Sequence, residues 1–170
     1  MSTMKKVKSA IYSSPIGDIQ ILVDGESLIF LDFADNTDRI DKLMGRRFDN
    51  FEIVESKNPA AMRDRLNRYF KGDWNAFEGL DVDTGGTDFQ RSVWRGLRAI
   101  PTGQSISYDQ LARDVGNPNA IRAAASANAN NPISIVIPCH RVIGKNGAMR
   151  GYAGGIERKV WLLRHEGALI

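Results

Sequence analysis

The sequence predicts a mixed α+β protein, with a small N-terminal α/β part and a mostly helical C-terminal part. Short apolar segments separated by turn residues occupy the start of the chain, whereas capped helical patterns fill its second half. A turn-rich, acidic stretch with the pair Gly85–Gly86 lies between them. We therefore expect two domains, residues 1–86 with the linker and residues 87–170.

In the N-terminal part, the segments 19–24 and 27–33 are apolar, and the turn between them contains Gly25, so we expect two strands of a meander. Residues 58–72 have a helical pattern, with Pro59 in the first turn and Gly72 at the end. One face of this helix carries Met62, Leu66, Tyr69 and Phe70.

A helix is predicted over residues 87–100, because Thr87 and Gln90 form the pattern of a capping box. Its expected buried stripe is Phe89, Val93, Trp94, Leu97 and Ile100.

Two short helices follow within residues 107–132 and are joined at Gly116, which is the spacing of a helix-turn-helix. Asn117 suits the N-cap of the second helix and Pro118 its first position. A last helix within residues 154–167 is expected to bury Ile156, Val160 and Leu163 and to end at Gly167.

The composition excludes several classes of protein. The hydrophobic content of 42% and the charged content of 25% are ordinary for a globular chain of 170 residues. The apolar run around Ile133–Ile137 is too short for a membrane span, and the N-terminus lacks the apolar core of a signal peptide. One cysteine excludes an internal disulfide framework and suits a reducing cytoplasm. One cysteine and two distant histidines show no zinc-ligand spacing, so no metal is expected. No cofactor is expected either.

The net charge of +3 hides an asymmetry between the two halves of the chain. Residues 1–86 hold 12 Lys and Arg against 15 Asp and Glu, whereas residues 87–170 hold 11 against 5. The basic half indicates either a surface that meets a polyanion or a solvated basic face.

The second helix of the pair is unusual for a DNA-reading helix, because Arg122 is its only charge. A backbone with such small side chains fits either a close approach to a duplex or tight packing in a core, and the segment alone favours the core. After this helix, Asn131 either braces a sharp turn or caps the helix end. The small residues that surround Arg122 are Ala123, Ala124, Ala125, Ser126 and Ala127.

The only cysteine, Cys139, stands between Pro138 and His140, just after an apolar, strand-like run. Most cysteines of this kind are small buried hydrophobes, but a nucleophilic thiol needs a neighbour that favours the thiolate. His140 and Arg141 are such neighbours. Because adjacent residues on a helix do not face each other, a bridging water is the expected proton path between Cys139 and His140.

A histidine base needs a partner for its second ring nitrogen, usually a carboxylate. Glu166 lies in the last turn of its helix, where the helix dipole disfavours a negative charge. Departures from local rules often mark functional sites, so we expect Glu166 to orient His140. The alternative is a surface acid that pairs with Arg164 or caps nearby amides.

Together these motifs resemble the O6-alkylguanine-DNA alkyltransferases, also called methylated-DNA–protein-cysteine methyltransferases. The resemblance rests on "GNPNAIRAAASANANNPISIVIPCHRVIGKNG" and "GYAGGIERKVWLLRHEG", and it is strong over residues 87–169. The N-terminal part more loosely resembles the small ribonuclease H-like α/β domain of this family.

The resemblance implies that Cys139 takes the alkyl group from O6 of guanine in DNA and keeps it, so that each molecule acts once. O4-alkylthymine is an open second substrate. By the same resemblance, His140 would take the thiol proton through a water and Glu166 would hold the imidazole. Asn131 would brace the turn before Cys139, and Tyr108 would help to rotate the target nucleotide. The substrate pocket would consist of Pro138, Val142, Tyr152 and Ala153, where some family members have serine at the last position.

The target base would be flipped out of the duplex, with Arg122 filling its place in the stack. The resemblance implies that double-stranded DNA is bound through the minor groove with low sequence specificity. The contacts would come from Tyr108, Arg122, Ala123, Ala125 and Ser126. A monomer is expected, with or without cooperative binding along DNA.

Three other classes of protein fit the sequence less well. A zinc deaminase needs a second cysteine three positions after the first and a His-x-Glu motif, both of which are missing. A thiol hydrolase has no use for a helix-turn-helix. The main alternative is a non-catalytic module that binds alkylated DNA as a flag for repair, but such relatives replace the cysteine that is present here.

Overall fold

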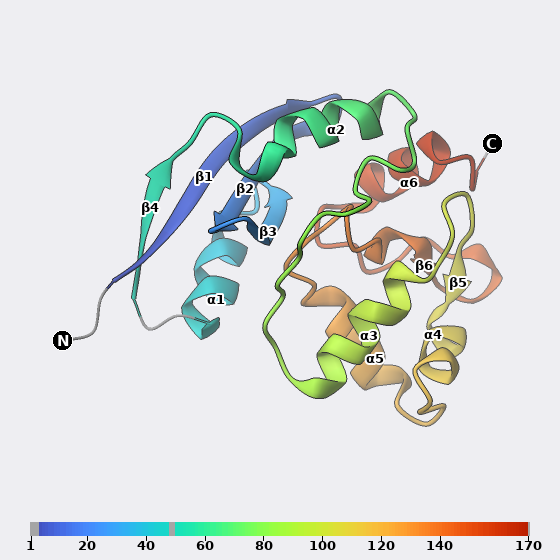
Figure 1. Cartoon of the computed structure of the whole chain (residues 1–170). Helices are drawn as coiled ribbons and strands as arrows, with labels where there is room; N and C mark the ends of the chain where they lie inside the picture. The colour runs from blue at the N-terminus through green and yellow to red at the C-terminus, as the bar shows by residue number, and fades with distance from the viewer. Residues whose placement is uncertain (1–3, 48–49, 170) are drawn as a thin grey trace. The chain divides into compact units, whose positions relative to one another are not determined.

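The mixed α+β class is confirmed. The computed structural model describes residues 4–47 and 50–169, and the chain divides into two compact units, Met1–Gly85 and Gly86–Ile170. The first is built around a sheet and the second is mostly helical (Figure 1). None of the helices in the described ranges has the length and apolar content that crossing a membrane requires.

The N-terminal unit holds a four-stranded sheet in the order β3-β2-β1-β4. Strands β1, β2 and β3 pair antiparallel, and β4 pairs parallel to β1. The elements of this unit are β1 (Lys5–Ser14), β2 (Gly17–Asp24), β3 (Ser27–Phe33), α1 (Thr37–Arg47), β4 (Phe51–Glu55), a 3-10 turn (Pro59–Ala61) and α2 (Met62–Phe70).

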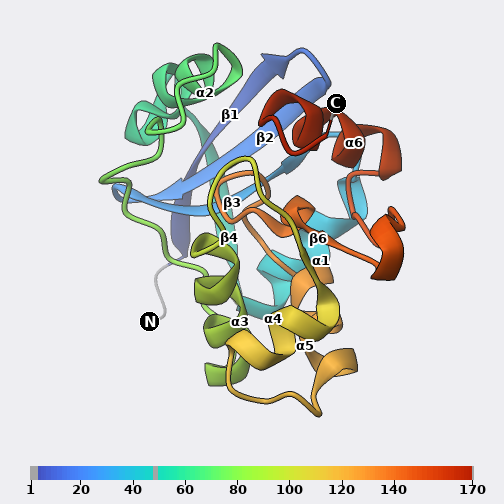
Figure 2. The ribbon, with the colours of Figure 1, turned by 90° about the vertical axis from the view of Figure 1, so that its right-hand side faces the viewer.

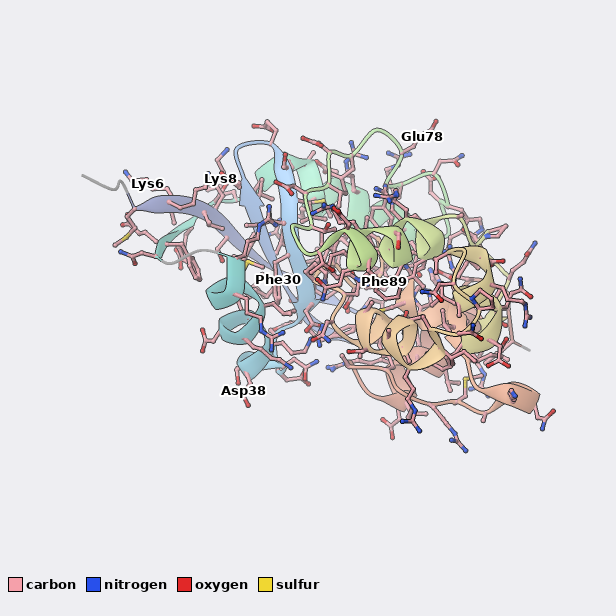
Figure 3. The ribbon with its side chains drawn as sticks, turned by 90° about the horizontal axis from the view of Figure 1, so that it is seen from below. Lys6, Lys8, Phe30, Asp38, Glu78 and Phe89 are labelled. Carbon is pink, nitrogen blue, oxygen red and sulfur yellow. The ribbon has the colours of Figure 1, made fainter. Side chains whose placement is uncertain are left out.

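Helices α1 and α2 cover opposite faces of this sheet. Val7 of β1 shares a core cluster with Phe30 and with Met44 of α1. Tyr12, which points to the other face because side chains alternate along a strand, donates a hydrogen bond to Asn67 of α2. Figure 3 shows Phe30 between the sheet and α1, with Lys6 and Lys8 at the surface. Burial on both faces is most complete along β2 and β3, whereas most of β4 is exposed.

The two predicted strands are β2 and β3, but the sequence analysis missed β1, α1 and β4. Helix α1 was hidden because it buries only Met44 among many charged residues. The predicted helix of residues 58–72 is α2, although Pro59 begins a separate 3-10 turn before it. Gly72 follows with a φ of 93°, which fits its predicted role as the stop.

The C-terminal unit is mostly helical and also holds a short parallel pair of strands (Figure 2). The predicted capping box of Thr87 and Gln90 is present at the start of α3. The elements are α3 (Asp88–Arg98), β5 (Ile106–Ser107), α4 (Tyr108–Asp114), α5 (Ile121–Ala129), a 3-10 turn (Cys139–Arg141), β6 (Val142–Ile143), a second 3-10 turn (Lys145–Gly147) and α6 (Ile156–His165).

Two predictions about these helices were wrong. Helix α5 begins at Ile121 rather than Pro118, because residues 117–120 form a turn in which Ala120 donates its N–H to the carbonyl of Asn117. In α6, Ile156 is exposed. The buried face instead carries Lys159, Leu162 and Leu163, so the helix is rotated away from the face that apolar residues alone suggested.

Candidate active site

The apolar run before Cys139 forms a buried turn rather than the strand-like segment that its composition suggested. Asn131 holds this turn with both ends of its amide. Its Oδ1 accepts the N–H of Ile133 at 3.0 Å, and its Nδ2 donates to the carbonyl of Ile137 at 2.8 Å. Asn131 is 1% exposed, so these bonds replace the ladder bonds that a strand would make.

Cys139 opens the 3-10 turn that follows, and Pro138 precedes it as the N-cap. The N–H of Cys139 donates to the carbonyl of Ile137 at 2.8 Å, which ties the cysteine backbone to the turn that Asn131 braces. Cys139 is 5% exposed. The thiol is therefore held on a fixed backbone at the edge of the core.

His140 and Arg141 both bind Glu166. Nε2 of His140 lies 3.0 Å from Oε2 of Glu166. The guanidinium of Arg141 donates through Nε to Oε1 at 2.8 Å and through Nη2 to Oε2 at 2.9 Å. Its Nη1 donates to the carbonyl of Ile100 at 2.7 Å. Arg141 is thus bound to Glu166, and the alternative partner Arg164 does not hold this acid.

This hydrogen-bond network determines the charge states of Glu166 and His140. Burial by itself raises the pKa of Glu166, but hydrogen bonds from His140 and Arg141 outweigh it and hold that pKa below its usual range. Burial also lowers the pKa of His140, although Glu166 acts in the opposite direction. Glu166 is therefore ionised at neutral pH and His140 is uncharged.

Tyr108 and Tyr152 lie near this network. The hydroxyl of Tyr108 donates to the carbonyl of Arg150 at 3.3 Å, and a Cβ at Gly151 would approach that hydroxyl to 3.0 Å. The ring of Tyr152 meets the ring of His140 edge to face, with 6.4 Å between the centroids. The segment 150–152, which holds the predicted pocket residue Tyr152, thus contacts both Tyr108 and His140.

Lys159 was missed by the sequence analysis. Its side chain is fully buried, and Nζ donates to the carbonyls of Val142 at 2.6 Å and Arg150 at 2.5 Å. Burial lowers the pKa of Lys159 to about 8, and the negative charge of a Cys139 thiolate opposes that shift. Lys159, Leu162, Leu163 and Glu166 recur at i, i+3, i+4 and i+7, a stripe that would have pointed to this lysine.

Helix α5 presents its small residues on two sides. Ala124 and Ala127 are buried in the unit, so part of the core interpretation applies to them. Arg122, Ala123 and Ser126 are exposed and Ala125 is partly exposed. The exposed face is therefore flat, with one long cationic side chain at its start.

Two of the remaining predicted pocket residues, Pro138 and Val142, flank the 3-10 turn that Cys139 opens. Pro138 and Val142 are buried, and Ala153 is partly exposed after Tyr152. Within the described residues, no group of three or more His, Cys, Asp and Glu side chains is arranged to hold a metal ion. The structure thus gathers a thiol, an imidazole, a carboxylate and two tyrosines in one unit.

Both halves of the chain match known family models. Residues 7–84 match the ribonuclease-like domain of 6-O-methylguanine DNA methyltransferase, and residues 88–168 match the DNA binding domain of the same protein. The sheet unit and the helical unit therefore define the chain as a protein of the 6-O-methylguanine DNA methyltransferase class.

Individual relatives agree. The chain is 47% identical to a methylated-DNA–protein-cysteine methyltransferase of Salmonella typhimurium, over 93% of this chain and 94% of that protein. It is 50% identical to one of Mycobacterium bovis, over 90% and 88%. The crystal structure of Mycobacterium tuberculosis OGT in complex with DNA matches with a TM-score of 0.81 and 36% identity, over 96% and 93%. The chain belongs to the methylated-DNA–protein-cysteine methyltransferase family.

Proposed function

We propose that this protein repairs DNA by a single, irreversible transfer of the alkyl group from O6 of guanine to Sγ of Cys139. His140 acts as the base and Glu166 orients it. The observation that carries this assignment is the state of the His140 ring. Its Nε2 faces an ionised carboxylate, whereas its buried Nδ1 has no hydrogen-bond partner among the described residues.

This arrangement selects one tautomer. A neutral imidazole beside a carboxylate carries its hydrogen on the nitrogen that faces the carboxylate, so Nε2 donates and Nδ1 keeps a lone pair. A base needs such a lone pair near the nucleophile. Because Cys139 and His140 are adjacent in the chain, we infer that a water carries the proton from Sγ to Nδ1.

The transfer is balanced as follows. The Sγ–carbon bond forms, the carbon–O6 bond breaks, and the bonding pair stays with the guanine. The thiol proton goes to His140, and the guanine takes a proton from the hydroxyl of Tyr108. The imidazolium of His140 and the phenolate of Tyr108 that remain are neutralised by proton exchange with water. Burial and the nearby Cys139 charge raise the pKa of Tyr108, so its hydroxyl stays protonated until negative charge develops on the guanine. Overall, a proton replaces the alkyl group on the base.

The charge of Lys159 favours the same step. An ammonium that interacts with the charge of Cys139 stabilises the thiolate, and the two carbonyls that bind Nζ hold it in place. Nothing in this network can cleave the thioether, and the sequence has no second cysteine to accept the alkyl group. The protein is therefore consumed by one reaction.

Access to O6 requires that the guanine leave the duplex. We propose that α4 and α5 act as a helix-turn-helix whose exposed α5 face enters the minor groove. Ala123, Ala125 and Ser126 permit the close approach, and Arg122 fills the vacated place in the stack. Residues 87–170 would then form the DNA-binding and alkyl-transfer domain, and residues 1–86 a supporting domain.

The pocket would use backbone groups of Cys139 and Val142 for the guanine amine, with Tyr152 as a wall. The Val142 carbonyl already accepts Lys159, so it would use its second lone pair for the base. Ala153 leaves only its backbone N–H to stabilise charge on O6. Because its lone cysteine needs a reducing environment, we place the protein in the cytoplasm.

The proposal is tested by mixing the protein with a duplex that contains one O6-methylguanine and measuring the intact mass. We expect a gain of one methylene per chain, confined to the peptide that holds Cys139 and absent in Cys139→Ser. Binding of the duplex without a change in mass would refute the transfer. The protein would then be a damage-binding module, as the alternative reading holds.

A further inference from the structure

Helix α3 carries three arginines on its outer side. Arg91, Arg95 and Arg98 are spaced at i, i+4 and i+7, so their side chains form one stripe along the helix. The opposite face is buried through Val93 and Leu97. Arg95 and Arg98 are exposed and Arg91 is partly exposed. We call Arg91, Arg95 and Arg98 the α3 arginine stripe.

The charge of this stripe is mostly uncompensated. Arg91 is tied down, because it donates to the carbonyl of Gly86 and forms an ion pair with Asp88. Asp88 is the only acid in α3. Among the residues that the structure describes, none forms a hydrogen bond or ion pair with the side chain of Arg95 or Arg98. Two guanidinium groups are therefore left for a partner.

The stripe lies beside α5. Trp94 of α3 donates its indole N–H to the carbonyl of Ala127 in α5 at 2.9 Å. Arg91 and Arg98 stand three residues before and four residues after Trp94, so they are its neighbours on the helix surface. Figure 1 shows α3 alongside α5, in agreement with this hydrogen bond. Arg98 thus extends from the side of α3 that borders the proposed DNA-entering helix, and Arg95 lies beside Arg98 in the stripe.

We propose that the α3 arginine stripe binds the phosphate backbone next to the groove that α5 enters, as a second DNA contact. The inference rests on the proposed function. The minor groove is only about 6 Å wide, so a phosphate backbone runs close on either side of a helix placed in it. A neighbouring helix then overlies that backbone. Arginine suits this place because its planar donors bind phosphate oxygens in pairs.

The stripe differs in role from Arg122. Arg122 would enter the base stack, whereas Arg95 and Arg98 would contact only phosphates. Phosphate contacts hold a protein in register without reading sequence, which fits low sequence specificity. They also release counterions, so each contact removes about 0.9 from the slope of log K against log salt concentration.

The test compares the double variant Arg95→Ala/Arg98→Ala with the control Lys57→Ala/Lys71→Ala. The control removes the same charge from exposed positions of the N-terminal unit. Affinity for an undamaged duplex is measured between 50 and 200 mM salt. Loss of two contacts makes the negative slope shallower by about 1.8, so the affinity advantage of the wild type over the variant falls about 12-fold over this range. We expect this change only in the arginine variant.

Each result bears on the inference. An unchanged slope in the arginine variant overturns it and points to an acidic protein as the partner of the stripe. Equal loss in both double variants also overturns it, because the effect would then reflect net charge alone. Alkyl transfer to Cys139 is measured in parallel at 50 mM salt. If the wild type transfers the alkyl group but the slopes agree, only this inference fails; if it neither binds nor reacts, the proposed function fails with it.

Discussion

Replacing Glu166 by glutamine tests the central network of the site. Glu166 is 5% exposed and accepts three hydrogen bonds, one from His140 and two from Arg141. Glu166→Gln keeps the shape but replaces one acceptor oxygen by a donor NH₂ and removes the negative charge. The guanidinium of Arg141 then stays buried without a counter-charge, and His140 loses the group that selects its tautomer.

The loss of folding stability and the loss of transfer rate can both be estimated. Removing one partner of a buried ion pair costs about 3–5 kcal/mol of folding stability, because the remaining charge is left uncompensated. General-base catalysis contributes roughly 10²–10⁴-fold to a rate, and a His140 ring without its orienting carboxylate would lose much of that factor. We therefore expect a lower free energy of unfolding and a transfer rate reduced by about 10²-fold or more.

The assay is single-turnover transfer to Cys139 from a duplex with O6-methylguanine, at a temperature where Glu166→Gln is still folded. The matched control is Glu157→Gln, an exposed acid in the first turn of the same helix. DNA affinity should stay unchanged in both variants, since neither residue lies on α5. A rate for Glu166→Gln within threefold of the wild type would refute the role of Glu166 as the orienting group.

The same residue produces a dependence of stability on pH. The folded pKa of Glu166 lies below its unfolded value, so its contribution to stability is fully present above pH about 4.3 and is lost as the pH falls through the folded pKa. Urea unfolding at pH 3 to 6 should therefore show a steeper acid loss in the wild type than in Glu166→Gln. Parallel curves for the two proteins would contradict this assignment.

Three further predictions follow from single side chains. As the pH rises from 8 to 10.5, the wild type should gain about 3 kcal/mol of folding stability, because Lys159 is neutral in the folded state but still charged in the unfolded state. The Lys159→Met variant lacks this gain, so its stability relative to the wild type should fall by the same amount. Urea unfolding at several pH values tests this, and a pH-independent difference would disprove it. Asn131→Ala should lower the free energy of unfolding by about 2–4 kcal/mol, since two buried backbone groups lose their partner, whereas Asn130→Ala should cost less than half as much. Arg122→Ala should slow transfer from a duplex without slowing transfer from the free base O6-benzylguanine, and equal slowing of both would argue against a wedge in the stack.

Local sequence patterns were sufficient for elements that carry their own signals. The capping box of Thr87 and Gln90 and the glycine stop at Gly72 are formed by neighbouring residues, so their prediction needed no tertiary information. The predicted start of α5 was wrong because Asn117 and Pro118 suit a tight turn as well as a helix N-terminus. Only packing decides between a turn and a helix there. Strand β4 was missed because four of its five residues are exposed, which removes the alternation that marks a strand.

The proposed pairing of a thiol with a histidine base could be inferred from the sequence because Cys139 and His140 are adjacent in the chain. Glu166 was readable because a carboxylate near a helix C-terminus departs from a local rule. The binding of Arg141 to Glu166 was not, since the two residues lie 25 positions apart and only the fold brings them together. The sequence analysis instead expected Arg141 to act on the thiol.

The sequence by itself determined the two-part organisation and the mixed fold class, and it singled out Cys139 as the proposed reactive group. Tertiary structure alone decided that Lys159, a residue normally found in water, is buried at the site. A lysine can be buried when acceptors take its donors, and here the carbonyls of Val142 and Arg150 do so. Those carbonyls converge on one point only when the chain is folded, and no local pattern encodes that convergence.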